Sequence, residues 1–227
     1  MNAPEHAPSP RRWPRRGLYA VTPECDDDAR LLSLAAAVLR GGAVALQYRS
    51  KLDSAPRRHA RAAALHALCG SHGALFIVND DIALTAAVGA DGVHLGVDDA
   101  GIGAARAALG PGVLIGASCY DSLERARAAH AAGADYLAFG AFFASPTKPA
   151  AARADPSLLS AAAVFGLPRV AIGGIRLDNA PALIRAGADL LAVVSDLFGH
   201  PDPQQRSTDY SALFASDAPI HSPSERQ

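Results

Sequence analysis

The sequence is poor in several features, and each scarcity excludes a class of protein. Its three cysteines, Cys25, Cys69 and Cys119, form no Cys-x-x-Cys pair, which argues against a disulfide framework and against a structural zinc site. This cysteine usage fits a reducing compartment, so we expect a cytoplasmic protein. No apolar run approaches the roughly 18 residues that a membrane span requires.

The sequence also lacks an excess of basic or of acidic residues. The 21 basic and 22 acidic residues give a net charge of −1, so no global charge steers the protein toward nucleic acid or a membrane surface. Arginine pairs at 11–12 and 15–16 superficially suggest an export signal, but no apolar signal core follows them. We therefore expect small-molecule partners and no nucleic acid or membrane partner.

Hydrophobic residues are abundant, at 50% of 227 residues, which is enough for one large domain. Apolar segments of strand length alternate with helical patterns, and the last helix is expected to begin at Asp202-Pro203 and run to Phe214. Eight such units with mostly short connections predict an α/β fold, a (β/α)₈ TIM barrel. An open doubly wound sheet stays as the alternative. The expected strands are 17–22, 43–48, 74–78, 92–95, 113–117, 136–140, 169–172 and 190–194.

The barrel is expected to form a single catalytic domain over residues 17–216. Residues 1–16 are rich in Pro and Arg and lack periodicity, so we expect a disordered arm, in which Trp13 either covers a barrel end or is itself disordered. Residues 217–227 are interpreted as a tail. The linkers 89–91, 133–135 and 187–189 each read Gly-Ala-Asp and join a helix to the next strand, which supports the count of units.

Polar residues follow the expected strands at their carboxyl ends, the rim that carries the chemistry of such barrels. Asp80 and Asp99 follow neighbouring strands, and hard oxygen donors of this kind suit Mg²⁺. Asp81 and Asp98 are better explained as caps of the following helices. Each feature alone has a plain structural explanation, and His94 is better interpreted as a packed or orienting residue than as a catalytic base.

The gathering of so many polar and charged residues at one rim is harder to explain by helix caps and turns alone. The only two lysines of the chain, Lys51 and Lys148, both fall in these loops. An amide, a guanidinium and an ammonium in 47–51 are suited to hold a base edge and a diphosphate. Glycines at 173–174 allow backbone N–H groups to approach a phosphate, which such barrels commonly bind after strands seven and eight.

In their order along the chain, these motifs resemble those of the thiamine phosphate synthase (thiamine-phosphate pyrophosphorylase) family. The resemblance covers about residues 17 to 200 and follows all eight units. The motifs that carry it are Leu18-Tyr19 with Val21-Thr22, Gln47-x-Arg49-x-Lys51, Ile77 to Asp80, Gly89 to Gly96, Ile115 to Ser118, Pro146-Thr147-Lys148, Ala171 to Ile175, and Val193 to Ser195.

The resemblance implies a transferase (EC 2.5.1.3) that joins 4-amino-2-methyl-5-hydroxymethylpyrimidine diphosphate to 4-methyl-5-hydroxyethylthiazole phosphate. It implies Mg²⁺ as cofactor, bound by Asp80 and Asp99. It also implies a catalytic set of Lys148, Arg49, Lys51 and Ser118. The implied substrate-binding residues are Gln47, Arg49, Lys51, Asn79, Ser118 and Lys148 for the pyrimidine diphosphate, and Ser145, Thr147, Gly174, Val194 and Ser195 for the thiazole phosphate. Tyr48, Ser50 and Pro146 are also expected to bind substrate.

Four positions depart from the family pattern. Val97 stands where Gln is frequent, Ala141 and Ala144 replace prolines, and Ser145 replaces a threonine but keeps its hydroxyl. The loop 144–154 is expected to act as a lid, less rigid without those prolines. Two alternatives remain, a thiazole tautomerase of the same fold and a non-catalytic barrel that binds a phosphate ligand. The oligomeric state stays open, and a homo-oligomer is compatible with the sequence.

Overall fold

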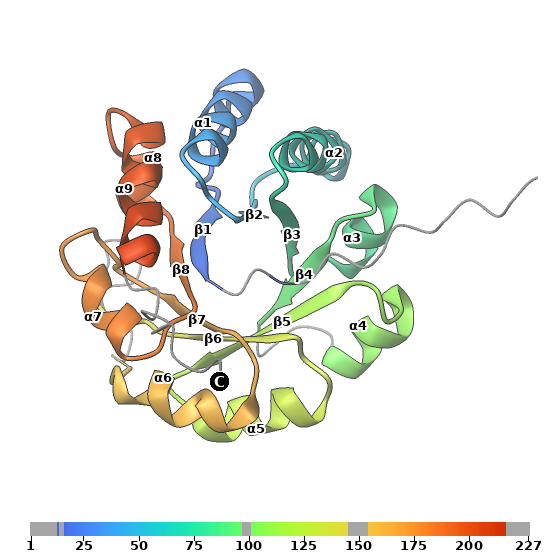
Figure 1. Cartoon of the computed structure of the whole chain (residues 1–227). Helices are drawn as coiled ribbons and strands as arrows, with labels where there is room; N and C mark the ends of the chain where they lie inside the picture. The colour runs from blue at the N-terminus through green and yellow to red at the C-terminus, as the bar shows by residue number, and fades with distance from the viewer. Residues whose placement is uncertain (1–12, 14–15, 97–100, 145–153, 217–227) are drawn as a thin grey trace, which may run out of the picture.

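The computed structural model describes residues 13, 16–96, 101–144 and 154–216. In this part of the chain eight parallel strands close into a barrel in the order β1 to β8, with helices around the outside (Figure 1). The strands are β1 (Gly17–Val21), β2 (Ala45–Tyr48), β3 (Leu75–Asn79), β4 (Gly92–Leu95), β5 (Leu114–Tyr120), β6 (Tyr136–Phe139), β7 (Arg169–Ile172) and β8 (Leu190–Val193).

Closure of the barrel confirms the predicted TIM fold and rules out the open sheet. β1 pairs in parallel with β2 on one side and with β8 on the other, where Gly17 lies opposite Leu190. A doubly wound sheet would leave two free edges. The first and last strands therefore meet, and all eight carboxyl ends lie on one rim.

Helices follow the strands as the periodicity predicts, with two local differences. The described helices are α1 (Asp28–Arg40), α2 (Ala55–Ser71), α3 (Ile82–Val88), α4 (Ile102–Leu109), α5 (Leu123–Ala131), α6 (Ser157–Ala161), α7 (Ala180–Arg185), α8 (Ser195–Phe198) and α9 (Pro203–Ser216). The predicted sixth helix ends as a 3₁₀ turn, η1 (Ala162–Phe165), and the short α8 was not predicted. Four residues are too few for a periodic pattern to be recognised.

The repeated Gly-Ala-Asp linkers have a common structural role at the amino-terminal rim. The Asp91 carboxylate accepts the backbone N–H of Phe76 at 2.8 Å, and that of Asp135 accepts the N–H of Ile115 at 2.7 Å. Asp189 accepts the N–H of Arg169 at 2.9 Å. Each aspartate thus ties the start of an even-numbered strand to the preceding odd-numbered strand, which explains why the aspartate recurs.

The core has two layers, because successive strand residues point to opposite faces. Tyr19, Ile77, Tyr136 and Leu190 fill the barrel interior, whereas residues such as Phe76 pack between the strands and the helices. Both faces are buried, so the strands read as nearly continuous apolar runs.

Trp13, from the segment expected to be a disordered arm, packs against the barrel interior. Its ring stacks on Tyr136 with centroids 4.1 Å apart and meets Tyr19 edge-on at 5.7 Å. Tyr136 is the first residue of β6, so Trp13 lies at the amino-terminal end of the barrel. Of the two options for Trp13, the structure supports the one in which it covers a barrel end; most of residues 1–16 and all of 217–227 lie outside the described residues.

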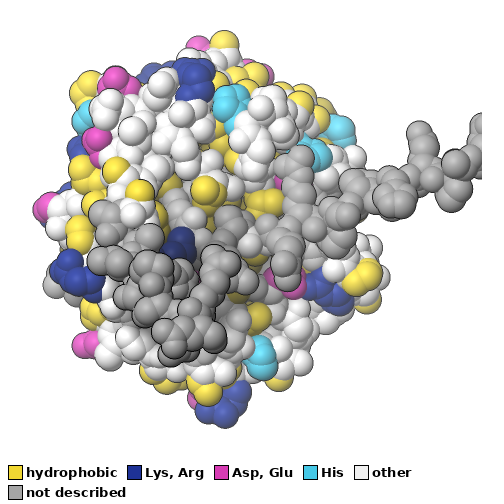
Figure 2. Space-filling view, viewed as in Figure 1, with side chains coloured by type: hydrophobic (Ala, Val, Ile, Leu, Met, Phe, Trp, Pro, Cys, Tyr) yellow, Lys and Arg dark blue, Asp and Glu magenta, His cyan; other side chains and the backbone are white. Residues whose placement is uncertain are grey.

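The surface agrees with the balanced charge of the sequence. On the face in Figure 2, basic and acidic side chains are scattered among apolar and neutral ones. None of the helices in the described part of the chain has the length and apolar composition needed to cross a bilayer.

Candidate active site

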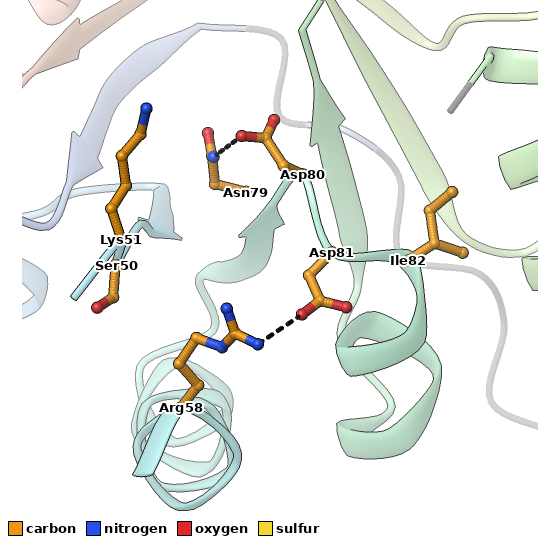
Figure 3. Close-up of a pocket in the computed structure, with 7 residues that line it drawn as sticks. All are labelled: Ser50, Lys51, Arg58, Asn79, Asp80, Asp81 and Ile82. Carbon is orange, nitrogen blue, oxygen red and sulfur yellow. Dashed lines mark hydrogen bonds and ion pairs between the residues drawn. The ribbon is translucent and has the colours of Figure 1, made fainter. Parts of the chain in front are cut away.

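The carboxyl ends of β2 and β3 enclose an open pocket of about 520 Å³. In the close-up of Figure 3, the side chains of Lys51, Asn79 and Asp80 extend in the same direction from these neighbouring strand ends. Arg58 is directed instead at Asp81, with Nη2 and Oδ2 3.7 Å apart. The pocket thus brings an ammonium, an amide and a carboxylate into one space, and Ser50, Arg58, Asp81 and Ile82 complete its lining.

Asp80 occupies a backbone conformation that is uncommon for a residue with a side chain. Its φ is +64°, in the left-handed region, and such conformations cluster at functional sites. Its carboxylate accepts a hydrogen bond from Asn79 Nδ2 at 2.5 Å. By contrast Asp81 caps α3 by accepting the N–H of Leu84, so the prediction that Asp81 is a helix cap is confirmed.

The donors at this rim fit a hard cation. Among the described residues no three His, Cys, Asp or Glu side chains form a cluster. Mg²⁺ does not need such a cluster, since one or two carboxylates together with substrate phosphates and water commonly hold it. Asp80, which is exposed at the pocket, has a carboxylate suited to such a role.

The loop after β2 is held by an acidic residue that the sequence-based interpretation missed. Glu24, in the loop after β1, accepts the backbone N–H of Lys51 at 2.9 Å and the hydroxyl of Ser50 at 3.3 Å. Its carboxylate also lies 3.9 Å from Nη1 of Arg49. Glu24 therefore fixes the loop that presents the predicted diphosphate-binding groups; no motif in the sequence distinguished it from a helix-capping acid.

A second anchor lies beneath the same loop. Tyr48 donates its phenol hydrogen to Asp53 at 2.8 Å, and Nη1 of Arg61 on α2 donates to the same oxygen at 2.9 Å. Burial raises the pKa of Tyr48, and the hydrogen bond to Asp53 raises it further. The Tyr48 side chain thus faces the helical layer and not the barrel interior.

Two predicted substrate-binding residues, Gln47 and Ser118, point into the barrel interior. Gln47 donates from Nε2 to the hydroxyl of Tyr19 at 2.8 Å. Ser118 Oγ lies 2.9 Å from Nε2 of His94, whose side chain is buried. The position of His94 agrees with the packed or orienting role expected for it. Alternation places Gln47, Asn79, His94 and Ser118 on the inner face, at neighbouring strand ends.

Three of the predicted thiazole phosphate residues, Gly174, Val194 and Ser195, lie after β7 and β8. Gly174 has a φ of +64°, and a Cβ there would lie 2.6 Å from the carbonyl oxygens of Phe143 and Ala144. Only glycine allows the loops after β6 and β7 to approach so closely. Val194 and Ser195 line a second pocket of about 500 Å³, together with residues of the loop after β1 that include Glu24.

Several predicted site residues lie outside the described residues. They are Asp99, Ser145, Pro146, Thr147 and Lys148, together with the proposed cap Asp98 and the departure at Val97. The pairing of Asp80 with Asp99, the lid and the position of Lys148 therefore remain predictions.

Comparison with known proteins identifies the family. The family model described as thiamine monophosphate synthase matches residues 18–197. The thiamine-phosphate synthase of Azoarcus sp. (strain BH72) is 58% identical over 201 residues, which are 88% of this chain and 98% of the relative. That of Chromobacterium violaceum is 60% identical over 186 residues, 82% of this chain and 90% of the relative.

Structural comparison gives the same answer. Thiamine phosphate pyrophosphorylase from Pyrococcus furiosus superimposes with a TM-score of 0.80 at 31% identity, over 89% of this chain and 97% of that protein. Fold, order of motifs and relatives agree, and the chain belongs to the thiamine monophosphate synthase family.

Proposed function

We propose that the rim residues described above divide between them the binding and ionisation steps of thiamine phosphate synthesis. The activity itself follows from the family and from relatives that are more than half identical over most of both chains: the protein is a transferase, a thiamine-phosphate synthase (EC 2.5.1.3). It joins the pyrimidine diphosphate to the thiazole phosphate and releases diphosphate.

The reaction suits a site without a strong base. The amino group of the pyrimidine ring pushes electron density toward the exocyclic CH₂, so its C–O bond to diphosphate breaks first. The thiazole nitrogen then forms the new C–N bond with the resulting cation, and the electron pair of the broken bond leaves with diphosphate. The protein must therefore stabilise charge on the leaving group and keep water away from the cation.

The pocket of Lys51 and Asp80 is the proposed place of the diphosphate. Arg49 and Lys51 would supply positive charge, and Asn79 and Gln47 would present amide groups to the aminopyrimidine. Ser118, with its hydroxyl at the inner face of β5, would donate to the diphosphate. Lys148 would complete the charge from the loop after β6, and that loop would close as the lid.

Mg²⁺ is the proposed cofactor, held by Asp80 and, from the loop after β4, by Asp99. When bound, it would neutralise part of the charge of the leaving diphosphate. The support from this structure is the exposed carboxylate of Asp80, in a pocket shared with Lys51. Backbone groups at Gly174, Val194 and Ser195, with Ser145, Pro146 and Thr147, are proposed to hold the thiazole phosphate.

The observation that carries this assignment is the convergence of Gln47, Asn79 and Ser118 on the inner face at neighbouring strand ends, with the exposed Asp80 directly after Asn79. Neither alternative accounts for it equally well. A thiazole tautomerase moves a proton and needs no site for a leaving diphosphate, and a binding barrel needs no preorganised ionisation site. The names of the relatives also favour the synthase.

One assay separates the three functions. Purified full-length protein is incubated with both substrates and Mg²⁺, and thiamine phosphate and diphosphate are quantified; a parallel sample contains a chelator. We expect the two products in equal amounts, and none in the chelated sample. If no product forms, isomerisation of a thiazole carboxylate phosphate supplied in a further sample would indicate the tautomerase. Binding of the thiazole phosphate, measured by calorimetry, without any turnover would indicate the non-catalytic barrel. Turnover at the parent rate in chelator would refute the proposed role of Mg²⁺.

A further inference from the structure

A continuous chain of five hydrogen-bonded side chains crosses the barrel interior. Gln47 on β2 donates to the hydroxyl of Tyr19 on β1 at 2.8 Å, and this hydroxyl lies 3.0 Å from that of Tyr136 on β6. The Tyr136 hydroxyl lies 3.0 Å from Nδ1 of His94 on β4, and Nε2 of His94 lies 2.9 Å from Oγ of Ser118 on β5. These hydrogen bonds thus link two proposed substrate-binding residues, Gln47 on β2 and Ser118 on β5.

The Gln47 end gives this chain a direction. The NH₂ group of Gln47 can only donate, so the Tyr19 oxygen accepts. If Tyr19 gives its own hydrogen to Tyr136, Tyr136 is free to donate to Nδ1 of His94. Neutral His94 then carries its hydrogen on Nε2 and donates to Ser118.

The opposite direction of the hydrogen bonds would leave one buried hydroxyl hydrogen without an acceptor. If Nδ1 of His94 donated to Tyr136 and Tyr136 to Tyr19, the Tyr19 oxygen would accept twice. Its own hydrogen would then have no partner among the five groups, although Tyr19 is only 1% exposed. An unpaired buried donor is costly, so the order that uses every hydrogen is favoured.

The surroundings of Tyr136 hold its hydroxyl in place. The residue is fully buried, and the Trp13 ring lies against it at an interplanar angle of 14°. A side chain at Gly116 of β5 would overlap the hydroxyl end of the Tyr136 ring, so only glycine leaves room for it there. Burial raises the pKa of both Tyr136 and Tyr19, which keeps both phenols protonated and able to donate.

We propose that Tyr136 is a positioning residue of the synthase, which acts through His94 on Ser118. By donating to Nδ1, Tyr136 keeps the His94 hydrogen on Nε2, where it occupies a lone pair of Ser118. The hydroxyl hydrogen of Ser118 is then turned away from His94 and is available to an oxygen of the leaving diphosphate. The inference rests on the proposed role of Ser118 in binding that group.

Nitrogen NMR of the histidine rings tests the direction of the chain without any turnover. The protein has eight histidines. The signals of His94 are identified as those missing from the spectrum of a His94→Asn variant. At about pH 8, above the ordinary histidine pKa of about 6.5, we expect a protonated Nε2 and an unprotonated Nδ1. In Tyr136→Phe the two tautomers should mix, whereas Tyr19→Phe, which removes the other phenol, should keep the parent tautomer. A protonated Nδ1 in the parent protein would overturn the proposal.

Single-turnover kinetics then test whether Tyr136 acts through Ser118. We expect Ser118→Ala to slow the chemical step about 100-fold, as for the loss of one preorganised donor, and Tyr136→Phe about 10-fold, as for one hydrogen bond. The double variant should be no slower than Ser118→Ala alone. Multiplication of the two losses would mean that Tyr136 does not act through Ser118.

A matched control separates this effect from simple loss of stability. Ser207 is fully buried and donates to the carbonyl of Val38 at 2.6 Å, within the helical layer. Ser207→Ala should lower the melting temperature as Tyr136→Phe does, yet keep the parent rate. If Ser118→Ala itself kept the parent rate, the role of Ser118 would fail, and the tautomer measurement would still decide whether Tyr136 sets His94.

Discussion

Arg61 on α2 and Asp53 in the loop after β2 form a buried ion pair, with Nη1 and Oδ2 2.9 Å apart and side chains 4% and 6% exposed. Nε of Arg61 also donates to Asp28 at the start of α1 at 2.8 Å. Asp53 accepts the phenol hydrogen of Tyr48 as well. One guanidinium thus joins two helices to the loop that carries Arg49 and Lys51, so the shape of the proposed diphosphate site depends on this pair.

Asp53→Asn should therefore lower both stability and substrate affinity. We expect a loss of about 2 kcal/mol in the free energy of unfolding, the size of a hydrogen bond to a charged group, and a raised KM for the pyrimidine diphosphate. Asp178→Asn is the control, because its ion pair with Arg176 is exposed and exposed pairs contribute little. Denaturant unfolding and steady-state kinetics measure both effects; equal stability of the two variants would contradict the prediction.

The same pair predicts how this stability depends on pH. Burial tends to raise the pKa of Asp53, but hydrogen bonds from Tyr48 and Ser50 and the charge of Arg61 outweigh it, so the pKa is lowered. A carboxylate with a lowered pKa stabilises the fold above its unfolded pKa of about 3.9 and loses that contribution as the pH falls through the folded value. The stability difference between parent and Asp53→Asn should thus be constant near pH 7 and shrink below about pH 4. If the stability difference between the two proteins grew as the pH fell, the pKa of Asp53 would be raised by folding and the prediction would be wrong.

Asp80→Asn should weaken the response to Mg²⁺ while the fold stays intact. The amide has the size of the carboxylate but lacks its charge, so a much higher Mg²⁺ concentration should be needed for half-maximal turnover. Asp81→Asn is the matched neighbour, since asparagine caps helices as well as aspartate does. Metal titrations of the three proteins provide the test. Identical curves for Asp80→Asn and the parent would remove Asp80 from the metal site.

Trp13 should matter for stability, although its neighbours in the N-terminal segment should not. A Trp13→Ala variant loses the stacking on Tyr136 and the edge contact with Tyr19, and we expect a cost of about 2 kcal/mol for a half-buried aromatic ring. Removal of residues 1–12 should leave the melting temperature unchanged. Calorimetry of both variants measures the effect, and an unchanged melting temperature of Trp13→Ala would show that the ring contacts of Trp13 do not stabilise the barrel.

Gly174→Ala should impair the thiazole site more than its backbone strain alone would. Gly166 has nearly the same conformation, with φ of +67° against +64°, but open space where a Cβ would stand. Gly166→Ala should thus report strain of about 1 kcal/mol. Gly174→Ala should in addition push apart the loops after β6 and β7 and raise KM for the thiazole phosphate. Equal KM values in the two variants would argue against a role for Gly174.

Lys148 is predicted to serve the transition state more than substrate capture. Negative charge grows on the diphosphate as its bond breaks, so a fixed cation helps most at that moment. Lys148→Ala should lower kcat by about 10²–10³-fold, with little rise in KM, and Lys148→Arg should restore only part of it. Single-turnover kinetics at saturating thiazole phosphate measure the step. An unchanged chemical step with a raised KM would withdraw the role.

The sequence alone determined the barrel and the rim. The apolar runs and the Gly-Ala-Asp linkers predicted the eight strands, because strands buried on both faces must be apolar and glycine ends the helices before them. The positions of Asp80 and Lys51 after their strands predicted that polar side chains would meet at one rim. These signals depend on residues close together in the sequence, so they can be recognised without the tertiary structure.

Only the tertiary structure decided which distant side chains meet. Tyr19 and Tyr136 look like core residues in the sequence, and Glu24, Asp53 and Arg61 look like surface charges. Their partners lie up to 117 positions away, as between the two tyrosine hydroxyls. Closure of the barrel brings β1, β4 and β6 around one interior, and hydrogen bonds there depend on distance in space. The position of Trp13, four residues before the first strand, has the same cause. Its packing site at the amino-terminal end of the barrel is formed by Tyr19 and Tyr136, which only closure of the barrel brings together.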